Sequence, residues 1–203
     1  MSSIKLTANS GGGTFEIKAP SSGSNPRVLT VPDTASGTVL TTTNPRSGNT
    51  VQRVTATSHT RLDTTSTTYV ASAHSITITP TFANSKILVN FTLVFNTNGS
   101  NHRGSLDIYR SINGGTFTGI APVGSAQTVG ANNNSGFFGQ IRADNSRLQA
   151  PTHVHYLDSP SYSLGNSIVY KLYARTSNSS NTIEVPSTSN EEPVVMMLTE
   201  IAA

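Results

Sequence analysis

Apolar and polar positions alternate in short runs over much of this 203-residue chain, and turn-forming residues separate the runs. The longest run covers residues 86–95. Its apolar side chains occupy every second position, at Ile87, Val89, Phe91, Leu93 and Phe95. Because successive side chains of a strand point to opposite faces of a sheet, this spacing predicts a strand with one buried face. Residues 106–110 and 168–175 alternate in the same way and are also predicted to be strands.

Turn signals lie between these runs, at Asn98-Gly99, at Asn113-Gly114-Gly115 and over residues 177–181. The last run, residues 194–201, is apolar at odd and even positions alike, which predicts a strand that is central in its sheet or covered on both faces. Strands that recur about every ten residues favour an antiparallel two-sheet sandwich, and a jelly roll is its most economical form. Residues 129–135 are predicted to be an exposed loop.

The first part of the chain has a different pattern. Residues 4–7 and 14–18 alternate around three consecutive glycines, which predicts a hairpin. Two more short strands are expected at residues 27–32 and 38–43. All four carry few large apolar side chains, so this segment buries too little surface to fold by itself. We expect it to be wrapped around, intertwined with or docked on partner chains.

A linker is predicted at residues 44–49, which contain Pro and Gly but no apolar side chain. The chain is therefore divided into two parts. Residues 1–48 are expected to be an N-terminal attachment and oligomerisation β arm, and residues 49–203 a jelly-roll-like β-sandwich head.

Composition strengthens the all-β prediction and narrows the possible functions. Only 11% of the residues are charged and 34% are hydrophobic, and the remainder is dominated by Ser, Thr, Asn and Gly. These residues are poor helix formers, which disfavours helical bundles, coiled coils and doubly wound α/β enzymes. The absence of Cys excludes disulfides, thiolate metal sites and Cys nucleophiles. No apolar run is long enough for a membrane-spanning helix, and the first residues do not resemble a secretory signal, so membrane insertion and secretion are not expected.

The net charge of +3 arises from 13 Lys and Arg against 10 Asp and Glu. The basic residues are scattered along the sequence, whereas nucleic-acid-binding proteins usually cluster them on one face or element. We therefore expect no nucleic-acid partner.

No catalytic motif stands out. The chain has neither a G-x-S-x-G nucleophile elbow nor a glycine-rich phosphate loop that leads into a helix. Paired carboxylates are the usual catalysts of glycoside hydrolysis, but no spacing among the acidic residues selects a pair. The candidates are Asp63, Asp107, Asp144, Asp158, Glu184, Glu191, Glu192 and Glu200. We expect the protein not to be an enzyme, and we assign no catalytic residue and no cofactor.

The tyrosines allow two interpretations. Several of them exposed together would form a platform for a glycan, but strand tyrosines more often cover a sheet edge or an interface, and the second interpretation is favoured. The residues concerned are Tyr69, Tyr109, Tyr156, Tyr162, Tyr170 and Tyr173.

Two parts of the sequence resemble known proteins. Residues 3–7 and 15–20, followed by Leu29-Thr30-Val31-Pro32-Asp33-Thr34 and Gly37-Thr38-Val39-Leu40-Thr41-Thr42-Thr43, resemble the N-terminal segment of structural and fibre-like proteins of tailed bacteriophages, especially phages of marine and cyanobacterial hosts. Residues 76–80, 85–89 and 197–202 resemble a β-rich head of phage tail and head-fibre proteins.

This resemblance implies a virion component, assembled in the host cytoplasm and homotrimeric. The arm would attach to other virion proteins, and the exposed head would contact a host-surface glycan. Since no repeat or coiled-coil shaft is present, a short fibre or a fibre-like tail or head appendage is expected. The alternative is a capsid-decoration protein that binds no receptor, and a lesser alternative is a surface-polysaccharide depolymerase.

The resemblance also bears on His153-Val154-His155, which places two imidazoles on one face of a predicted strand. On the threefold axis of a trimer, six imidazoles would converge on one octahedral transition metal, as in the iron-binding histidine pairs of some trimeric phage fibres. The alternative is that both histidines bond to neighbouring residues. Because this strand is expected in a globular head and not in a slender shaft, no metal site is assigned.

Overall fold

A computed structural model describes residues 45–99, 102–121, 138–143, 147–187 and 192–203, together with the backbone of residues 3–7 and 14–18. The regular elements of these ranges are all β-strands, so the all-β prediction is confirmed. The chain divides into two units, residues 1–39 and 40–203.

The described part of the first unit is a hairpin. Strands β1 (Ser3–Thr7) and β2 (Thr14–Lys18) pair antiparallel, with Ser3 opposite Lys18 and Thr7 opposite Thr14. This confirms the hairpin that the alternation predicted.

Several other predictions fall outside the described residues. They are the strands at 27–32 and 38–43 and the exposed loop at 129–135. The boundary between arm and head after residue 48 likewise stays a prediction.

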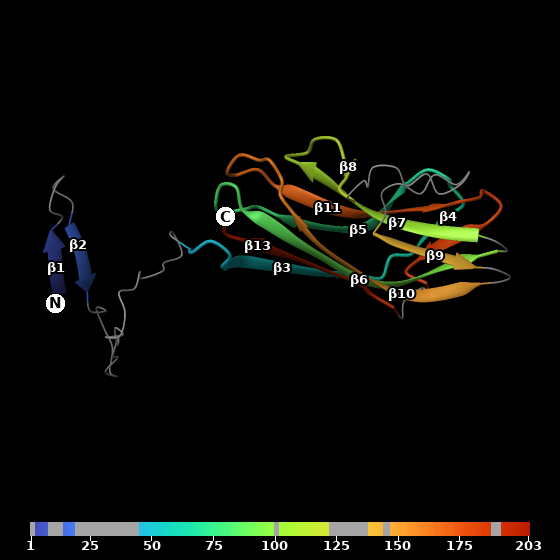
Figure 1. Cartoon of the computed structure of the whole chain (residues 1–203), viewed down its shortest axis with the longest axis horizontal. Coiled ribbons are helices and arrows are strands. Elements are labelled where there is room, and N and C mark those ends of the chain that lie inside the picture. Colours follow the sequence, from blue (N-terminus) through green and yellow to red (C-terminus); the bar gives the residue numbers. More distant parts are fainter. Residues whose placement is uncertain are drawn as a thin grey trace. The chain divides into compact units, whose positions relative to one another are not determined.

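The second unit consists of two antiparallel sheets (Figure 1). Their strands are β3 (Thr50–Ser58), β4 (Leu62–Thr64), β5 (Val70–Ile78), β6 (Lys86–Asn98), β7 (His102–Ile112), β8 (Thr118–Gly119), β9 (Gly139–Ala143), β10 (Leu148–Asp158), β11 (Ile168–Thr176), β12 (Thr182–Val185) and β13 (Val194–Ile201). The larger sheet has the order β3-β13-β6-β12-β4, with β10 on the other side of β6. The smaller sheet has the order β5-β11-β7-β8, with β9 also paired to β7.

Eight of these strands pair in jelly-roll order. β3 pairs with β13, β5 with β11, β6 with β10 and β7 with β9. Among the eight, the first strand therefore pairs with the last, the second with the second-last, and so on inward, and successive pairs belong to alternate sheets. A long antiparallel pair of chain segments that is folded into two sheets gives this nested order of pairing. The order confirms the predicted jelly-roll-like sandwich.

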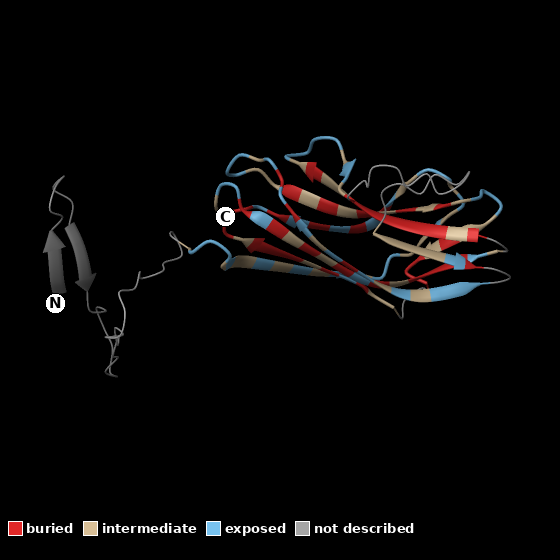
Figure 2. Cartoon of the chain, viewed as in Figure 1, coloured by how far each residue is buried: buried red, intermediate tan, exposed pale blue. Residues whose placement is uncertain are grey.

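The core lies between the two sheets and follows the predicted alternation (Figure 2). On β6, the five apolar side chains expected to point inward are at most 2% exposed, and on β11 Ile168, Tyr170 and Leu172 are fully buried. Burial of such side chains removes apolar surface from water and stabilises each by about 1.5 to 3 kcal/mol. The outward positions of the same strands remain available for a functional surface.

The chain enters and leaves the second unit at one end of the sandwich. The amide of Gly48 donates a 2.9 Å hydrogen bond to the carbonyl of Ala202, and the amide of Ala202 donates one of 2.9 Å to the carbonyl of Asn49. The predicted linker thus ends in contact with the C-terminal segment. By the strand register, the last residues of β3, β6 and β11 lie at the opposite end.

Strand β13 has the central position that its two-faced apolar pattern predicted, because it lies between β3 and β6. Its inward side chains, such as Met196 and Leu198, are buried. On the outward face, however, Val195 is 42% exposed and Met197 is partly exposed.

Candidate functional site

Aromatic and charged side chains gather on the outer face of the smaller sheet, over β7, β8 and β11. We call this group the aromatic patch. It consists of Tyr69, Asp107, Tyr109, Phe117, Lys171, Tyr173 and Arg175.

Strand alternation places most of these residues on one face. On β11 the even positions are buried in the core, so Lys171, Tyr173 and Arg175 point outward. The register with β7 sets Tyr109 directly opposite Lys171 and Asp107 directly opposite Tyr173. Cross-strand neighbours on one face lie within contact distance of each other.

The four aromatic rings form a continuous row. Tyr109 and Tyr173 stack, with ring centroids 3.9 Å apart and ring planes at 21°. Tyr69 extends the row beyond Tyr109 at 5.9 Å, and Phe117 extends it beyond Tyr173 at 6.2 Å. Both outer pairs are tilted, a geometry that aromatic quadrupoles favour.

A cation covers each end of the row. The guanidinium carbon of Arg175 lies 4.8 Å from the ring centroid of Tyr69, and Nζ of Lys171 lies 5.3 Å from that of Phe117. Both distances are within the range of cation–π attraction. One face of each ring is therefore occupied by another ring or by a cation.

Asp107 is the acidic member of the patch and is only 4% exposed. Burial raises the pKa of its carboxyl to about 7, although hydrogen bonds from the amides of Ile108 and Ala121 and the charge of Arg175 act in the opposite direction. A Cβ on Gly119 would lie 2.8 Å from Oδ2 of Asp107, so a larger residue there would require the carboxyl to shift. Burial also raises the pKa of Tyr69 to about 12.

Replacing Asp107 with Asn is expected to flatten the pH dependence of stability. A raised pKa means that the folded state binds the proton more tightly than the unfolded state, so wild-type stability decreases as the pH rises from about 4 to about 7. The D107N variant has no proton to lose there and should be more stable than wild type at pH 8, by on the order of 2 kcal/mol. Urea unfolding at pH 5 and pH 8 measures the difference. Equal pH dependence of the two proteins would contradict this account.

The six tyrosines named from the sequence do not form one platform. Tyr69, Tyr109 and Tyr173 meet in the aromatic patch, and the other three lie elsewhere. Tyr156 packs against Phe138 with ring centroids 5.2 Å apart, the hydroxyl of Tyr162 accepts a 3.0 Å hydrogen bond from the amide of Ser85, and Tyr170 is buried in the core.

The remaining members of the patch were not predicted as site residues: Phe117, Lys171 and Arg175 were not singled out, and Asp107 appeared only among the acidic candidates. The alternation of residues 168–175 already implied that Lys171, Tyr173 and Arg175 share a face.

The two histidines singled out from the sequence share the outward face of β10, as predicted, and both are exposed. Nδ1 of His153 lies 3.1 Å from Oγ1 of Thr92, and Nδ1 of His155 lies 2.6 Å from Oδ1 of Asn90. Both partners are directly opposite on β6. Within the described ranges, no three His, Asp or Glu side chains gather as metal ligands would. These contacts fit the alternative of bonding to neighbours, and no metal site is assigned to the pair.

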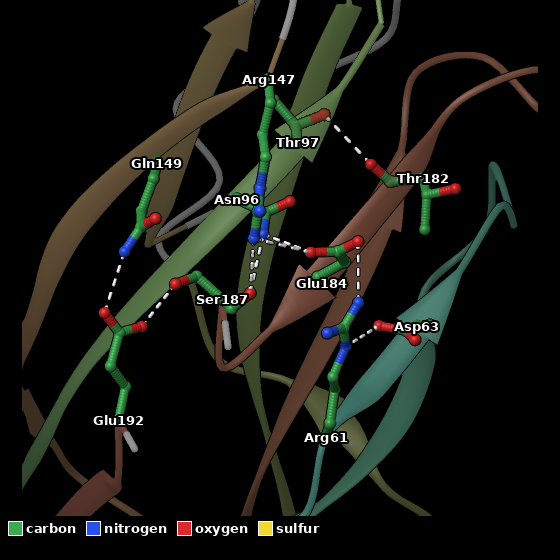
Figure 3. A network of polar contacts seen from close by, with 10 residues as sticks. All are labelled: Arg61, Asp63, Asn96, Thr97, Arg147, Gln149, Thr182, Glu184, Ser187 and Glu192. Carbon is green, nitrogen blue, oxygen red and sulfur yellow. Dashed lines mark hydrogen bonds and ion pairs between the residues drawn. The ribbon is translucent and has the colours of Figure 1, made fainter. Parts of the chain in front are cut away.

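Glu184 is the centre of a polar network (Figure 3). The pairing of β12 with the last residues of β6 places this network at the end of the sandwich away from residue 48. Its carboxylate pairs with Nη2 of Arg61 at 2.8 Å and with Nη2 of Arg147 at 3.2 Å, and it accepts a hydrogen bond from Asn96. The carbonyl of Ser187 accepts from both Asn96, at 2.9 Å, and Arg147, at 2.8 Å. The network joins β4, β6, β12 and the residue before β10, so Glu184 serves as a structural link.

Two further acidic candidates belong to the same network: Arg61 pairs with Asp63 as well as with Glu184, and Ser187 bonds to Glu192, which also accepts from Gln149. Asp158 and Glu200 lie elsewhere, each buried in contacts of its own. Asp144 and Glu191 lie outside the described residues.

No family model matches the chain, and no curated protein matches it. Within the described residues, no helix has the length and apolarity needed to cross a bilayer. Fold and surface therefore define the class: a jelly-roll β-sandwich protein with an aromatic and charged patch on one sheet.

Proposed function

We propose that this protein is a structural component of a tailed-phage particle, a homotrimeric short fibre or fibre-like tail or head appendage. Its N-terminal arm attaches to other virion proteins, and its jelly-roll head contacts a host-surface glycan. The resemblance of the sequence to phage fibre-like proteins motivates the proposal. The observation that carries it is a jelly roll that the chain enters at one end. If that end faces the particle, the rest of the head surface remains for contact with the host.

The outer face of the larger sheet supports self-association. Val195 on β13 and Leu157 on β10 are 42% and 46% exposed, and both point outward on this face. Arg53 on β3 and Lys86 at the start of β6 are charged outward residues of this face. Between them, the outward positions of β6, β10 and β13 that carry no Asp, Glu, Lys or Arg are Leu88, Asn90, Thr92, Val94, Pro151, His153, His155, Leu157, Val195, Met197 and Thr199. Uncharged surface with exposed large apolar side chains is typical of an interface between subunits.

Full-length protein is expected to sediment as a trimer, and Val195→Glu to shift it towards monomer, because three buried carboxylates would face apolar surface. The matched control is Thr77→Glu, at an exposed outward position of β5 on the other sheet, which should leave the trimer intact. A stable full-length monomer at micromolar concentration would overturn the homotrimer.

Removal of residues 1–44 is expected to abolish incorporation into particles while the head keeps its cooperative melting transition. The truncated protein keeps Gly48 and Asn49, whose backbones form hydrogen bonds with Ala202. Particles with the tagged protein at the tail would support adhesion, whereas labelling over the whole shell would favour capsid decoration. Absence of the full-length protein from particles would contradict both.

A further inference from the structure

We propose that mildly acidic pH separates copies of this chain that meet on the outer face of the larger sheet, through protonation of His153 and His155 on β10. The inference names the regulation of that self-association surface and rests on the proposed function, in which the surface joins copies of the chain. The partner that covers both histidines is therefore a second copy.

The two histidines lie beside the exposed apolar side chains of this face. The registers of β10 with β6 and of β6 with β13 place nine outward side chains in three rows, which we call the grid. The rows are His153, Thr92 and Val195; His155, Asn90 and Met197; and Leu157, Leu88 and Thr199.

The grid measures about 10 Å by 14 Å, from the spacing of strands and of alternate residues. Its two most exposed apolar side chains, Leu157 and Val195, are 46% and 42% exposed and occupy opposite corners. His155 lies next to Leu157 on β10, and His153 begins the row that ends at Val195. A copy that buries both corners therefore also covers the imidazoles.

Hydrogen bonding fixes where His155 takes up a proton. Its Nδ1 lies 2.6 Å from Oδ1 of Asn90. An amide oxygen only accepts hydrogen bonds, so Nδ1 is the donor and Nε2 holds the lone pair of the neutral ring. Nδ1 of His153 lies 3.1 Å from Oγ1 of Thr92. Both histidines are exposed in the single chain, where water can solvate the charged form.

The cations around the pair do not favour further positive charge. Lys86 on β6 and Arg53 on β3 are outward residues of the same face. Arg147 precedes β10 and binds Glu184, and Arg142 on β9, the other strand that contacts β10, has an interaction of its own.

Within the described ranges, no carboxylate forms an ion pair with either histidine. Asp158, at the end of β10, is buried and pairs with Arg110. The other carboxylates of this sheet face belong to the network around Glu184, which is opposite Asn96 on β6. Asn96 is in turn opposite Gln149, four residues along β10 from His153. Asp63 and Glu192, the other two acids of that network, have partners within it.

Proton uptake therefore opposes association. An imidazole in water changes charge near pH 6.5. Between two copies, the charged form would be removed from water beside apolar side chains and without a counter-charge, which is costly. Separated chains thus bind protons more tightly than assembled chains. Each buried imidazole should lower the association constant by up to about tenfold per pH unit below about 6.5.

The test is sedimentation equilibrium of the full-length protein at pH 8 and pH 5, at one protein concentration and one ionic strength. Wild type is expected to be a trimer at pH 8 and to lose at least about a hundredfold in association constant at pH 5. The double variant His153→Gln with His155→Gln keeps polar side chains that cannot take up a proton, so it should stay trimeric at both values. The matched control His59→Gln, at an exposed position between β3 and β4, should dissociate like wild type.

Far-UV circular dichroism of the same samples separates dissociation from unfolding. Burial lowers the pKa of His74 and of His102, so both reduce the stability of the folded head as the pH falls. The β signal of wild type is nevertheless expected to persist at pH 5. Its loss there would overturn the inference, because dissociation would then follow from unfolding.

Two further results would overturn it: an unchanged association constant between pH 8 and pH 5, or equal acid dissociation of wild type and the double variant. A double variant that does not assemble at pH 8 leaves the decision to the two single variants, each of which should keep about half of the pH dependence. A trimer that persists at pH 5 removes this switch and retains the proposed homotrimer, whereas a monomer at pH 8 removes both.

Discussion

Replacement of Glu200 with Gln is expected to lower the free energy of unfolding by about 3 kcal/mol. The side chain is fully buried, and its carboxylate accepts hydrogen bonds from Nε2 of Gln52 at 2.7 Å and from Oγ of Ser85 at 2.8 Å. The amides of Thr81 and Phe82 donate to the same carboxylate, each at 3.0 Å. The group thus ties β13 to β3 and to the loop between β5 and β6. In E200Q, the side-chain NH2 group faces some of these N–H and O–H donors. Those donors then have no acceptor.

The pH dependence of this effect has a definite sign. Burial opposes ionisation of Glu200, but the hydrogen bonds from Gln52, Thr81, Ser85 and Phe82 outweigh it and hold its pKa below the usual value. The stabilisation is therefore complete above the unfolded-state pKa of about 4.3 and is lost as the pH falls through the folded-state pKa. The difference in the free energy of unfolding between wild type and E200Q should therefore decrease at acidic pH.

Thermal melting at neutral pH measures the loss, which corresponds to a decrease of about 6 to 12 °C for a chain of this size. The same substitution at the partly exposed Glu192 is the control and should cost about 1 kcal/mol or less. A Glu200→Gln variant that melts within 2 °C of wild type, as a rough limit, would show that the buried carboxylate contributes little.

Replacement of Asp158 with Ala is expected to cost about 4 kcal/mol, because it leaves a largely buried guanidinium without its counter-charge. Asp158 ends β10 in the larger sheet, and its side chain is 7% exposed. Nη1 of Arg110 lies 2.7 and 2.6 Å from its two oxygens, and the hydroxyl of Tyr170 donates to Oδ2 at 2.7 Å. Both partners belong to the smaller sheet, so the carboxylate links the two layers of the sandwich.

Urea unfolding of the variants in a double-mutant cycle separates two contributions to stability: the cost of an unpaired buried charge and the loss of the contact between the two sheets. The cycle consists of Asp158→Leu, Arg110→Leu and the double variant. Each single variant should be strongly destabilised, whereas the double variant should regain much of the loss, since no unpaired charge remains. The control is Asp63→Ala, which removes a 52% exposed carboxylate that lies 2.6 Å from Arg61 and should cost about 1 kcal/mol or less. Additive effects at residues 110 and 158 would argue against a coupled pair.

The strands predicted at residues 86–95, 106–110, 168–175 and 194–201 are confirmed, because alternation and turn chemistry are local signals. Residues 194–201 coincide with β13, and the predicted run at 86–95 is extended only to Asn98 in β6. The turn at Asn113-Gly114 has both residues at positive φ, 49° and 73°, as a tight hairpin turn requires.

The candidate site was less accessible to sequence reasoning, because it depends on register between distant strands. Tyr109 and Tyr173 are 64 residues apart, and only the pairing of β7 with β11 brings their rings together. Arg103 and Arg142 likewise meet through the pairing of β7 with β9.

The pairing of β3 with β13 has a consequence for the order of events during synthesis. The strand between β3 and β6 in the larger sheet is β13, the last strand of the head to be synthesised. The edges of β3 and β6 that pair with β13 therefore stay unpaired until β13 has been translated. Such long-range pairing makes folding slow compared with that of helical domains. A nascent chain interrupted before β13 keeps an unfilled sheet and lacks Val195 and Met197, so under the proposed self-association it would not join complete copies.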